Sequence, residues 1–302
     1  MSKRLCRAGQ IVLCLAVVLI PTAGARGVAA PRFDVVAAEN FWGSIASQLA
    51  GDKATVESII VNPDTDPHSY EPTSADARTM AVSQMAILNG IGYDNWASQL
   101  LAASPSGSRI VLDVGDLLGL GEGANPHQWY SPSSVQKVIA AIVADYDRLA
   151  PADSAYFAAQ ERRFETTSLA RYNALRAEIR RRFIGVAVGY SESIFQPLGQ
   201  SLGLRLLTPY GFTKAIAEGA EVSARDRETV ERQARQRLIK VWVFNSQNVT
   251  PDVQEVNTIA RARHIPIVTI TETLSPSTVS FEQWQVAQLE RLITALHQAT
   301  GR

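Results

Sequence analysis

The feature that most constrains this chain is a long segment without glycine or proline, from Ala152 to Ile184. Apolar residues recur within it at spacings of three and four, the period of an α-helix. They are Leu169, Tyr172, Leu175, Ile179 and Phe183. At about 1.5 Å per residue, roughly thirty residues make a rod of about 45 Å, longer than an ordinary domain helix. We therefore expect a rigid linking helix over residues 151–184, with one lobe at 33–150 and another at 185–302.

Both lobes show β-rich segments that alternate with helical ones. The strands expected in the first lobe cover residues 33–38, 55–61, 85–91 and 109–114. Those of the second lobe cover residues 184–190, 204–207, 239–244 and 265–270. Strands separated by helices predict parallel pairing. The fold class is therefore predicted to be α/β, with two parallel-sheet lobes of about four strands each, joined by one long rigid helix.

The N-terminus carries the pattern of an export signal. Basic residues at positions 3, 4 and 7 precede an apolar run from Ile11 to Ile20, and Ala23-Gly24-Ala25 offers a cleavage site. We expect residues 1–25 to be a signal peptide, with an uncleaved membrane anchor as the alternative. The protein is then expected in the periplasm or elsewhere outside the cytoplasm, at the cell envelope.

Composition excludes some classes of partner and modification. The 29 basic residues balance 29 acidic ones, which argues against a nucleic-acid binder held by charge. Both cysteines, Cys6 and Cys14, lie within the expected signal. Neither stands after a small residue at the end of the apolar run, so no lipid-anchor cysteine is evident.

Two of the four histidines follow directly after proline. His68 ends the tripeptide Asp66-Pro67-His68, and His127 ends Asn125-Pro126-His127. Proline fixes its own φ and restricts the residue before it, so these histidines stand on stiff loops. A stiffly held imidazole suits a metal site. His264 and His297 lie on or beside helices, and we expect ordinary structural roles for them.

The four strongest candidate ligands all follow predicted strands. Ligands of open α/β sheets bind beyond the carboxyl ends of the strands, and His68 and His127 follow strands of the first lobe. Glu192 and Glu272 follow strands of the second lobe, while Asp64, Asp66 and Glu71 are competing carboxylates. Two neutral imidazoles facing two carboxylates would balance a divalent cation. This mixture of nitrogen and oxygen suits Zn²⁺, Mn²⁺ or Fe²⁺.

At these residues the chain resembles the metal-binding receptors of bacterial zinc and manganese ABC importers, the cluster A-I (cluster 9) solute-binding proteins. The resemblance covers the whole mature chain. It is carried by Asp66-Pro67-His68-Ser69-Tyr70-Glu71-Pro72, by Asn125-Pro126-His127-Gln128-Trp129-Tyr130-Ser131-Pro132, and by Thr271-Glu272-Thr273-Leu274 with Phe281-Glu282-Gln283-Trp284. Asn125 departs from the aspartate of the family, and Glu272 departs from its usual aspartate.

The resemblance implies two lobes that hold one metal between them. It implies His68 and His127 as ligands, Glu192 where the family usually has histidine, and Glu272 as the fourth ligand. It also implies delivery to an ABC importer permease. The histidine-rich loop of many zinc members is absent from Gly115 to Ala124, and together with Glu192 this favours manganese over zinc.

We therefore expect an exported, monomeric metal receptor and not an enzyme. It would capture one Zn²⁺ or Mn²⁺, with Fe²⁺ also compatible, and pass it to a permease. An exported metal-dependent hydrolase that uses the same histidines and glutamates is the alternative. Four protein ligands leave little room for the activated water that such an enzyme needs.

Overall fold

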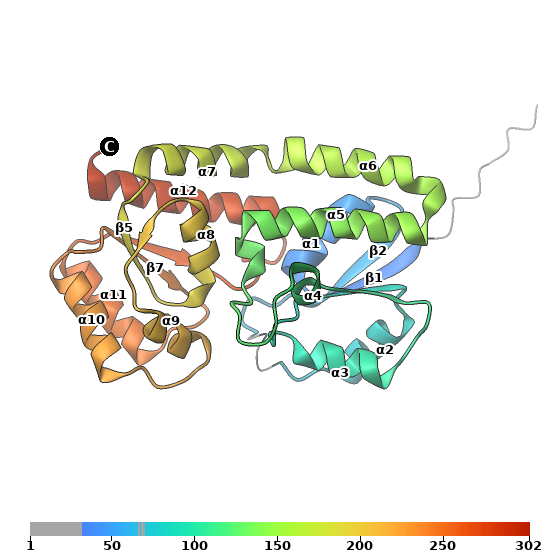
Figure 1. The fold of residues 1–302 in the computed structure, drawn as a ribbon, viewed down its shortest axis with the longest axis horizontal. Helices are drawn as coiled ribbons and strands as arrows, with labels where there is room; N and C mark the ends of the chain where they lie inside the picture. The colour runs from blue at the N-terminus through green and yellow to red at the C-terminus, as the bar shows by residue number, and fades with distance from the viewer. Residues whose placement is uncertain (1–31, 66, 68–69) are drawn as a thin grey trace, which may run out of the picture. The chain divides into compact units, whose positions relative to one another are not determined.

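The computed structural model describes residues 32–302, with the exception of residues 66, 68 and 69 (Figure 1). The signal peptide expected at 1–25 and the candidate ligand His68 lie outside the described residues. Residues 32–302 form one compact unit that contains two four-stranded parallel sheets. Helices cover the sheets, so the predicted α/β fold class is confirmed. The exact boundaries of lobes and link stay predictions.

The first sheet has the strand order β2-β1-β3-β4. Its strands are β1 (Phe33–Glu39), β2 (Ala54–Ile60), β3 (Met85–Leu88) and β4 (Ile110–Asp113). Val35 and Ala37 of β1 pack with α1 (Asn40–Ala50) and α5 (Pro132–Leu149). Val36 and Ala38 pack on the other face with α2 (Ser74–Val82) and α3 (Asn95–Ala103). Because both faces are covered, the central residues Val35–Ala38 are all apolar.

Local signals explain where two helices of this lobe begin. The Thr73 side chain caps α2 and forms a capping box with Asp76. The short helix α4 (Val114–Leu118), which the sequence pattern did not predict, is capped by the side chain of Asp113. The loop after α4 leads to the 3₁₀ turn η2 (Gln128–Tyr130), which begins at the residue after His127.

The second sheet repeats the same scheme in the order β6-β5-β7-β8. Its strands are β5 (Ala187–Tyr190), β6 (Arg205–Leu206), β7 (Val241–Asn245) and β8 (Ile267–Ile270). Trp242 packs with α9 (Tyr210–Ala217), α10 (Ala224–Arg235) and α11 (Pro251–Ala262). Val241 and Val243 face the opposite layer, which includes α8 (Gln196–Ser201) and α12 (Phe281–Thr300). Strand β7 therefore lies at the centre of this sheet, between β5 and β8.

The link between the sheets differs from the single regular helix expected. It consists of the 3₁₀ turn η3 (Pro151–Asp153), α6 (Ser154–Arg163), the π-helical turn η4 (Phe164–Ser168) and α7 (Ala170–Phe183). The Leu169 N–H donates to the Phe164 carbonyl at 2.9 Å, a wide-turn bond. Phe164 and Leu169 are both buried, so the wide turn keeps both side chains in the core.

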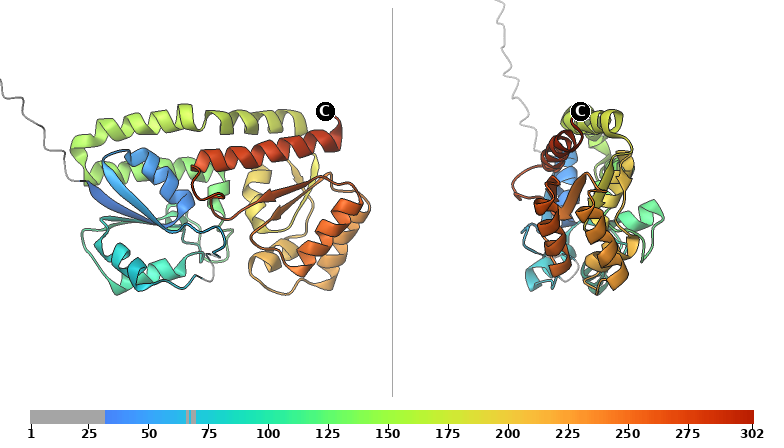
Figure 2. Two further views of the ribbon diagram at one scale, coloured as in Figure 1. Left: turned by 180° about the vertical axis from the view of Figure 1, so that it is seen from behind. Right: turned by 90° about the vertical axis from the view of Figure 1, so that its left-hand side faces the viewer.

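A second helix also joins the two halves. Helix α12 lies along α7 and extends from the second sheet toward the first (Figures 1 and 2). At its first turn, the Phe281 N–H donates to Ser44 Oγ at 2.9 Å, and Gln48 donates to Glu282 at 2.9 Å. One cluster of buried apolar side chains runs from the first sheet through these helices into the second sheet.

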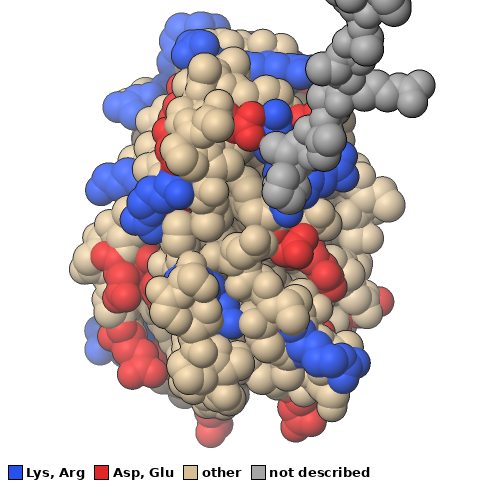
Figure 3. Space-filling view, turned by 90° about the vertical axis from the view of Figure 1, so that its right-hand side faces the viewer, with Lys and Arg blue, Asp and Glu red and all other residues tan. Residues whose placement is uncertain are grey.

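The surface shown in Figure 3 carries basic and acidic side chains that alternate with uncharged ones. This mixture accords with the net charge of zero. Within the described part of the chain, none of the helices combines the length and the apolar character that crossing a membrane would require.

Candidate metal centre

His127 reaches the cleft from the loop before η2, and its side chain is fully buried. Asn125 Oδ1 accepts the His127 backbone N–H at 3.0 Å and lies 2.8 Å from His127 Nδ1. The Asn125 amide donates to the Ser193 carbonyl at 2.8 Å, so its oxygen must face the imidazole. Nδ1 therefore carries the proton, and Nε2 is the atom that can bind a metal.

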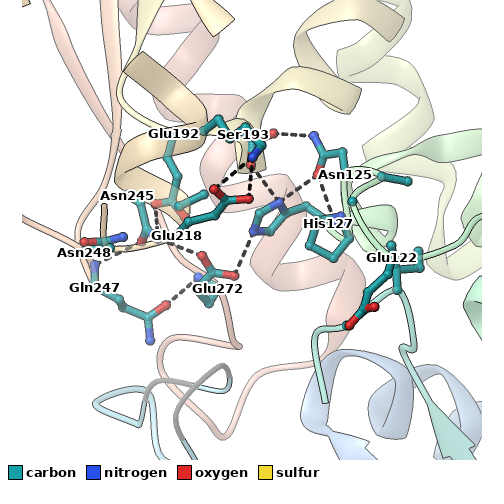
Figure 4. A pocket seen from close by; sticks show the side chains of 18 of the residues that line it. Glu122, Asn125, His127, Glu192, Ser193, Glu218, Asn245, Gln247, Asn248 and Glu272 are labelled. Atoms are coloured by element: carbon teal, nitrogen blue, oxygen red, sulfur yellow. Dashed lines mark hydrogen bonds and ion pairs between the residues drawn. The ribbon is translucent and has the colours of Figure 1, made fainter. Parts of the chain in front are cut away.

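Two glutamates face this imidazole from the second sheet (Figure 4). Glu192 follows β5 and Glu272 follows β8, and both side chains are buried. Glu272 Oε2 lies 3.5 Å from His127 Nε2 and accepts a hydrogen bond from the Tyr93 hydroxyl at 3.0 Å. One potential ligand atom from each of His127, Glu192 and Glu272 lies within 4.8 Å of the others. Such proximity is what a single metal ion requires.

Burial sets the protonation of this cluster. Burial, followed by the negative charge of Glu272, raises the pKa of Glu192 to about 8. Burial lowers the pKa of His127 to about 4, although the charge of Glu192 opposes that shift. Without a cation, burial therefore favours the neutral imidazole and the protonated form of Glu192. A divalent cation can replace that proton and offset the charge of both carboxylates.

The cluster lies on the wall of a cleft of about 830 Å³. Residues from both sheets line it, including Glu122 from the loop before His127 and Glu218 from the end of α9 (Figure 4). Asp64, one of the competing carboxylates, also lines the cleft but is outside the three-residue cluster. Glu71 is exposed and is not among the lining residues.

The segment that leads to His68 reaches the same cleft. Pro63, Asp64 and Thr65 line it, and the Gln247 side-chain amide donates to the Pro63 carbonyl. His68 itself and Asp66 lie outside the described residues, so their part in the site stays a prediction. Within the described part of the chain, His127, Glu192 and Glu272 are the only such group of candidate ligands.

The other two histidines occupy the ordinary positions expected for them. His264 follows α11 with a φ of 51°, and its backbone N–H closes the helix on Arg261. His297 lies on α12, where its ring meets the edge of Phe183 with centroids 5.0 Å apart. Both residues lie outside the cluster of candidate ligands.

Sequence reasoning missed two residues that hold the glutamates. Tyr93 binds Glu272 from the first lobe. Asn245 is the last residue of β7 and donates to both Glu192 and Glu272. Asn245 ends a strand, so the rule that selected Glu192 and Glu272 would have found it had amides been considered beside carboxylates.

Comparison with known proteins places the chain in a family. Residues 35–295 match the model for zinc-uptake complex component A, periplasmic. Among curated proteins, the iron-binding protein YfeA of Yersinia pestis is 32% identical over 111 residues. The manganese-binding lipoprotein MntA of Halalkalibacterium halodurans is 25% identical over 120 residues. These stretches cover 35% and 37% of this chain and 35% and 38% of those proteins, so the chain matches about a third of each relative.

Solved structures share the fold. The Mn-bound periplasmic metal binding protein from candidatus liberibacter asiaticus has a TM-score of 0.73 at 19% identity, over 88% of this chain and 100% of that one. FpvC of P. aeruginosa in complex with Ni²⁺ has a TM-score of 0.69 at 20% identity, over 90% of this chain and 99% of that one.

The family match confirms the resemblance carried by the two Pro-His motifs. It also supports the expectation of a transport receptor over that of an enzyme. This chain belongs to the family of the zinc-uptake complex component A, periplasmic.

Proposed function

We propose that this protein is an exported receptor that captures one divalent transition metal in its cleft and delivers it to an ABC-type importer. The observation that carries the proposal is the buried cluster of His127, Glu192 and Glu272, whose ligand atoms lie within 4.8 Å of one another. His68 is the proposed fourth ligand. Membership of the zinc-uptake family supports the same function.

The donor set selects the class of metal. One or two imidazole nitrogens with two carboxylates suit Zn²⁺, Mn²⁺ and Fe²⁺ and are a poor match for Ca²⁺, which prefers oxygen alone. The relatives reported above are named for iron and manganese, and similar solved proteins hold manganese and nickel. Intrinsic affinity favours Zn²⁺ over Mn²⁺ at such ligands.

The arrangement suits capture and release of the metal. Ser193 Oγ and Asn125 hold the His127 ring from both lobes, so the ring is oriented before the metal arrives. All ligands must be deprotonated to bind, so acidification should weaken binding. With four ligands from the protein, no position remains for an activated water, and the hydrolase alternative gains no support from the family.

Titration of metal-free residues 26–302 with Zn²⁺ and with Mn²⁺ tests the proposal. We expect one ion per chain for the wild type, and a large loss of affinity for His68→Ala, His127→Ala, Glu192→Gln and Glu272→Gln. His264→Ala is the matched control and should bind like the wild type. A stoichiometry other than one, or unchanged binding by His127→Ala, would contradict the proposed site.

Location and partners are part of the same proposal. We expect the mature protein in the periplasm or an equivalent extracytoplasmic space, as a monomer that docks on a membrane permease. Fractionation of cells that express the full chain tests the location. Metal uptake by cells that lack the gene tests delivery, because uptake should return with the wild type and not with His127→Ala.

A further inference from the structure

Asn245 lies between the two glutamates because of the order of the strands. Strand β7 is flanked by β5 and β8, and these two strands lead to Glu192 and Glu272. The residue that ends β7 is therefore placed midway between the residues that follow its neighbours. That residue is Asn245, and its side chain is fully buried.

The amide of Asn245 binds one oxygen of each glutamate. Nδ2 donates to Glu192 Oε2 at 2.9 Å and to Glu272 Oε1 at 2.9 Å (Figure 4). Its Oδ1 accepts the backbone N–H of Gln247 at 3.0 Å. That bond fixes the orientation of the amide, since a flipped side chain would set its oxygen against two carboxylates.

We propose that Asn245 is a positioning residue that makes each glutamate bind the metal through a single oxygen. The inference rests on the proposed function, namely metal binding by these glutamates. Asn245 holds Glu272 Oε1, whereas Oε2, which accepts the Tyr93 hydroxyl, is the atom that lies near His127 Nε2. Glu192 is held through Oε2 by the same amide, so Asn245 binds one oxygen of this carboxylate as well.

Single-oxygen binding has a consequence for metal choice. Two imidazoles and two single oxygens give four ligand atoms, the number that Zn²⁺ takes in closed sites. If the glutamates turned to present both oxygens, the coordination number would rise toward that of oxygen-rich manganese sites. Asn245 therefore shifts the preference of the site toward zinc. Glu192, which stands where the family usually has histidine, has the opposite effect and favours manganese.

Two substitutions of graded strength test this role. Asn245→Leu has a similar size and removes both donated hydrogen bonds, whereas Asn245→Ser keeps a single donor. Asn248→Leu is the matched control: Asn248 lines the same cleft and donates to the Ile216 carbonyl at 2.9 Å. Competitive titrations give the ratio of zinc to manganese affinity for each folded, metal-free variant. The visible absorption of the Co²⁺-loaded protein reports the coordination number independently.

We expect zinc affinity to fall by about 10–100-fold in Asn245→Leu, the range for groups that orient metal ligands. Manganese affinity should fall less, so that the zinc-to-manganese ratio drops by about tenfold. Asn245→Ser should lie between Asn245→Leu and the wild type, the Co²⁺ absorption should weaken in the same order, and Asn248→Leu should keep the wild-type ratio.

If Asn245→Ser and Asn245→Leu kept the zinc-to-manganese affinity ratio of the wild type, the inference would be overturned and the proposed function would stand. An equal change of ratio in Asn248→Leu would overturn it as well. Failure of the wild type to bind either metal would instead refute the proposed function itself.

Discussion

Glu39 offers the sharpest test of how this fold tolerates buried charge. It ends β1, is fully buried, and neither of its carboxylate oxygens makes a hydrogen bond of ordinary geometry. Burial, and then the nearby charge of Asp94, raises the pKa of Glu39 well above its usual value. Folded Glu39 therefore keeps its proton at pH values where the unfolded chain has lost it.

The sign of the stability effect follows from these two pKa values. Below the unfolded pKa of about 4.3, both states hold the proton and Glu39 contributes no pH dependence. As the pH rises from there toward the folded pKa, the free energy of unfolding falls by about 1.4 kcal/mol per pH unit. Glu39→Gln keeps the shape of the side chain and cannot titrate. The free energy of unfolding of the variant, relative to the wild type, should therefore rise by about 1.4 kcal/mol per pH unit over this range.

Urea unfolding of the metal-free protein at about pH 5, 6 and 7 measures the difference between Glu39→Gln and the wild type. Burial raises the pKa of Asp94 to about 6, so Asp94 titrates over the same range in both proteins. Its contribution is removed when the stability of the wild type is subtracted from that of the variant at each pH. Glu57→Gln, an exposed position on β2, is the control and should follow the wild type. If the stability of Glu39→Gln and the wild type ran parallel across this range, the reasoning would be refuted.

Three further substitutions, with Tyr146→Phe as a control for one of them, test single contacts. Asn125→Asp removes the amide that donates to Ser193 and sets two oxygens together, so we expect a loss of about 1 kcal/mol in urea unfolding; an unchanged midpoint would contradict this. Tyr93→Phe removes the hydroxyl that holds Glu272 and should weaken metal binding about tenfold or more by calorimetry. Tyr146→Phe, whose hydroxyl binds the Ala46 carbonyl away from the cleft, should bind metal normally. Thr73→Ala removes the cap of α2 and should cost about 1 kcal/mol in thermal unfolding, with no effect on metal binding.

Much of the fold follows from patterns within short segments. The β-rich run Phe33–Ala38 predicts a strand, and the structure divides its apolar side chains between two layers. The cap at Thr73 follows from a residue type at a fixed spacing. Such signals act over a few residues, so they can be recognised without knowledge of the tertiary structure.

Features that depend on packing between distant segments could not be predicted in this way. The period of three and four runs from Leu169 to Phe183, but the π-helical turn at Phe164–Ser168 depends on the packing beneath Phe164 and Leu169. The contact of α12 with Ser44 and Gln48 joins residues more than two hundred positions apart. Propensity carries no information about either arrangement.

In the candidate site, too, some features follow from local sequence patterns and others depend on the arrangement of distant segments. The Pro-His motif and the strand-end rule select His127, Glu192 and Glu272, which the structure brings together. The role of Asn245 depends on β7 lying between β5 and β8, and strand order is a property of the sheet as a whole. Tyr93 reaches Glu272 from the other lobe, so only the arrangement of the lobes reveals it.

The continuous apolar cluster that links the two sheets bears on how the molecule can be divided. Because α7 and α12 contribute to it together, a cut after Ile184 would leave exposed apolar surface on both fragments. Neither half is then an autonomous building block that could be grafted, swapped or shed on its own. The cleft therefore lies within a single compact unit, and a division of the chain would disrupt both walls of the site.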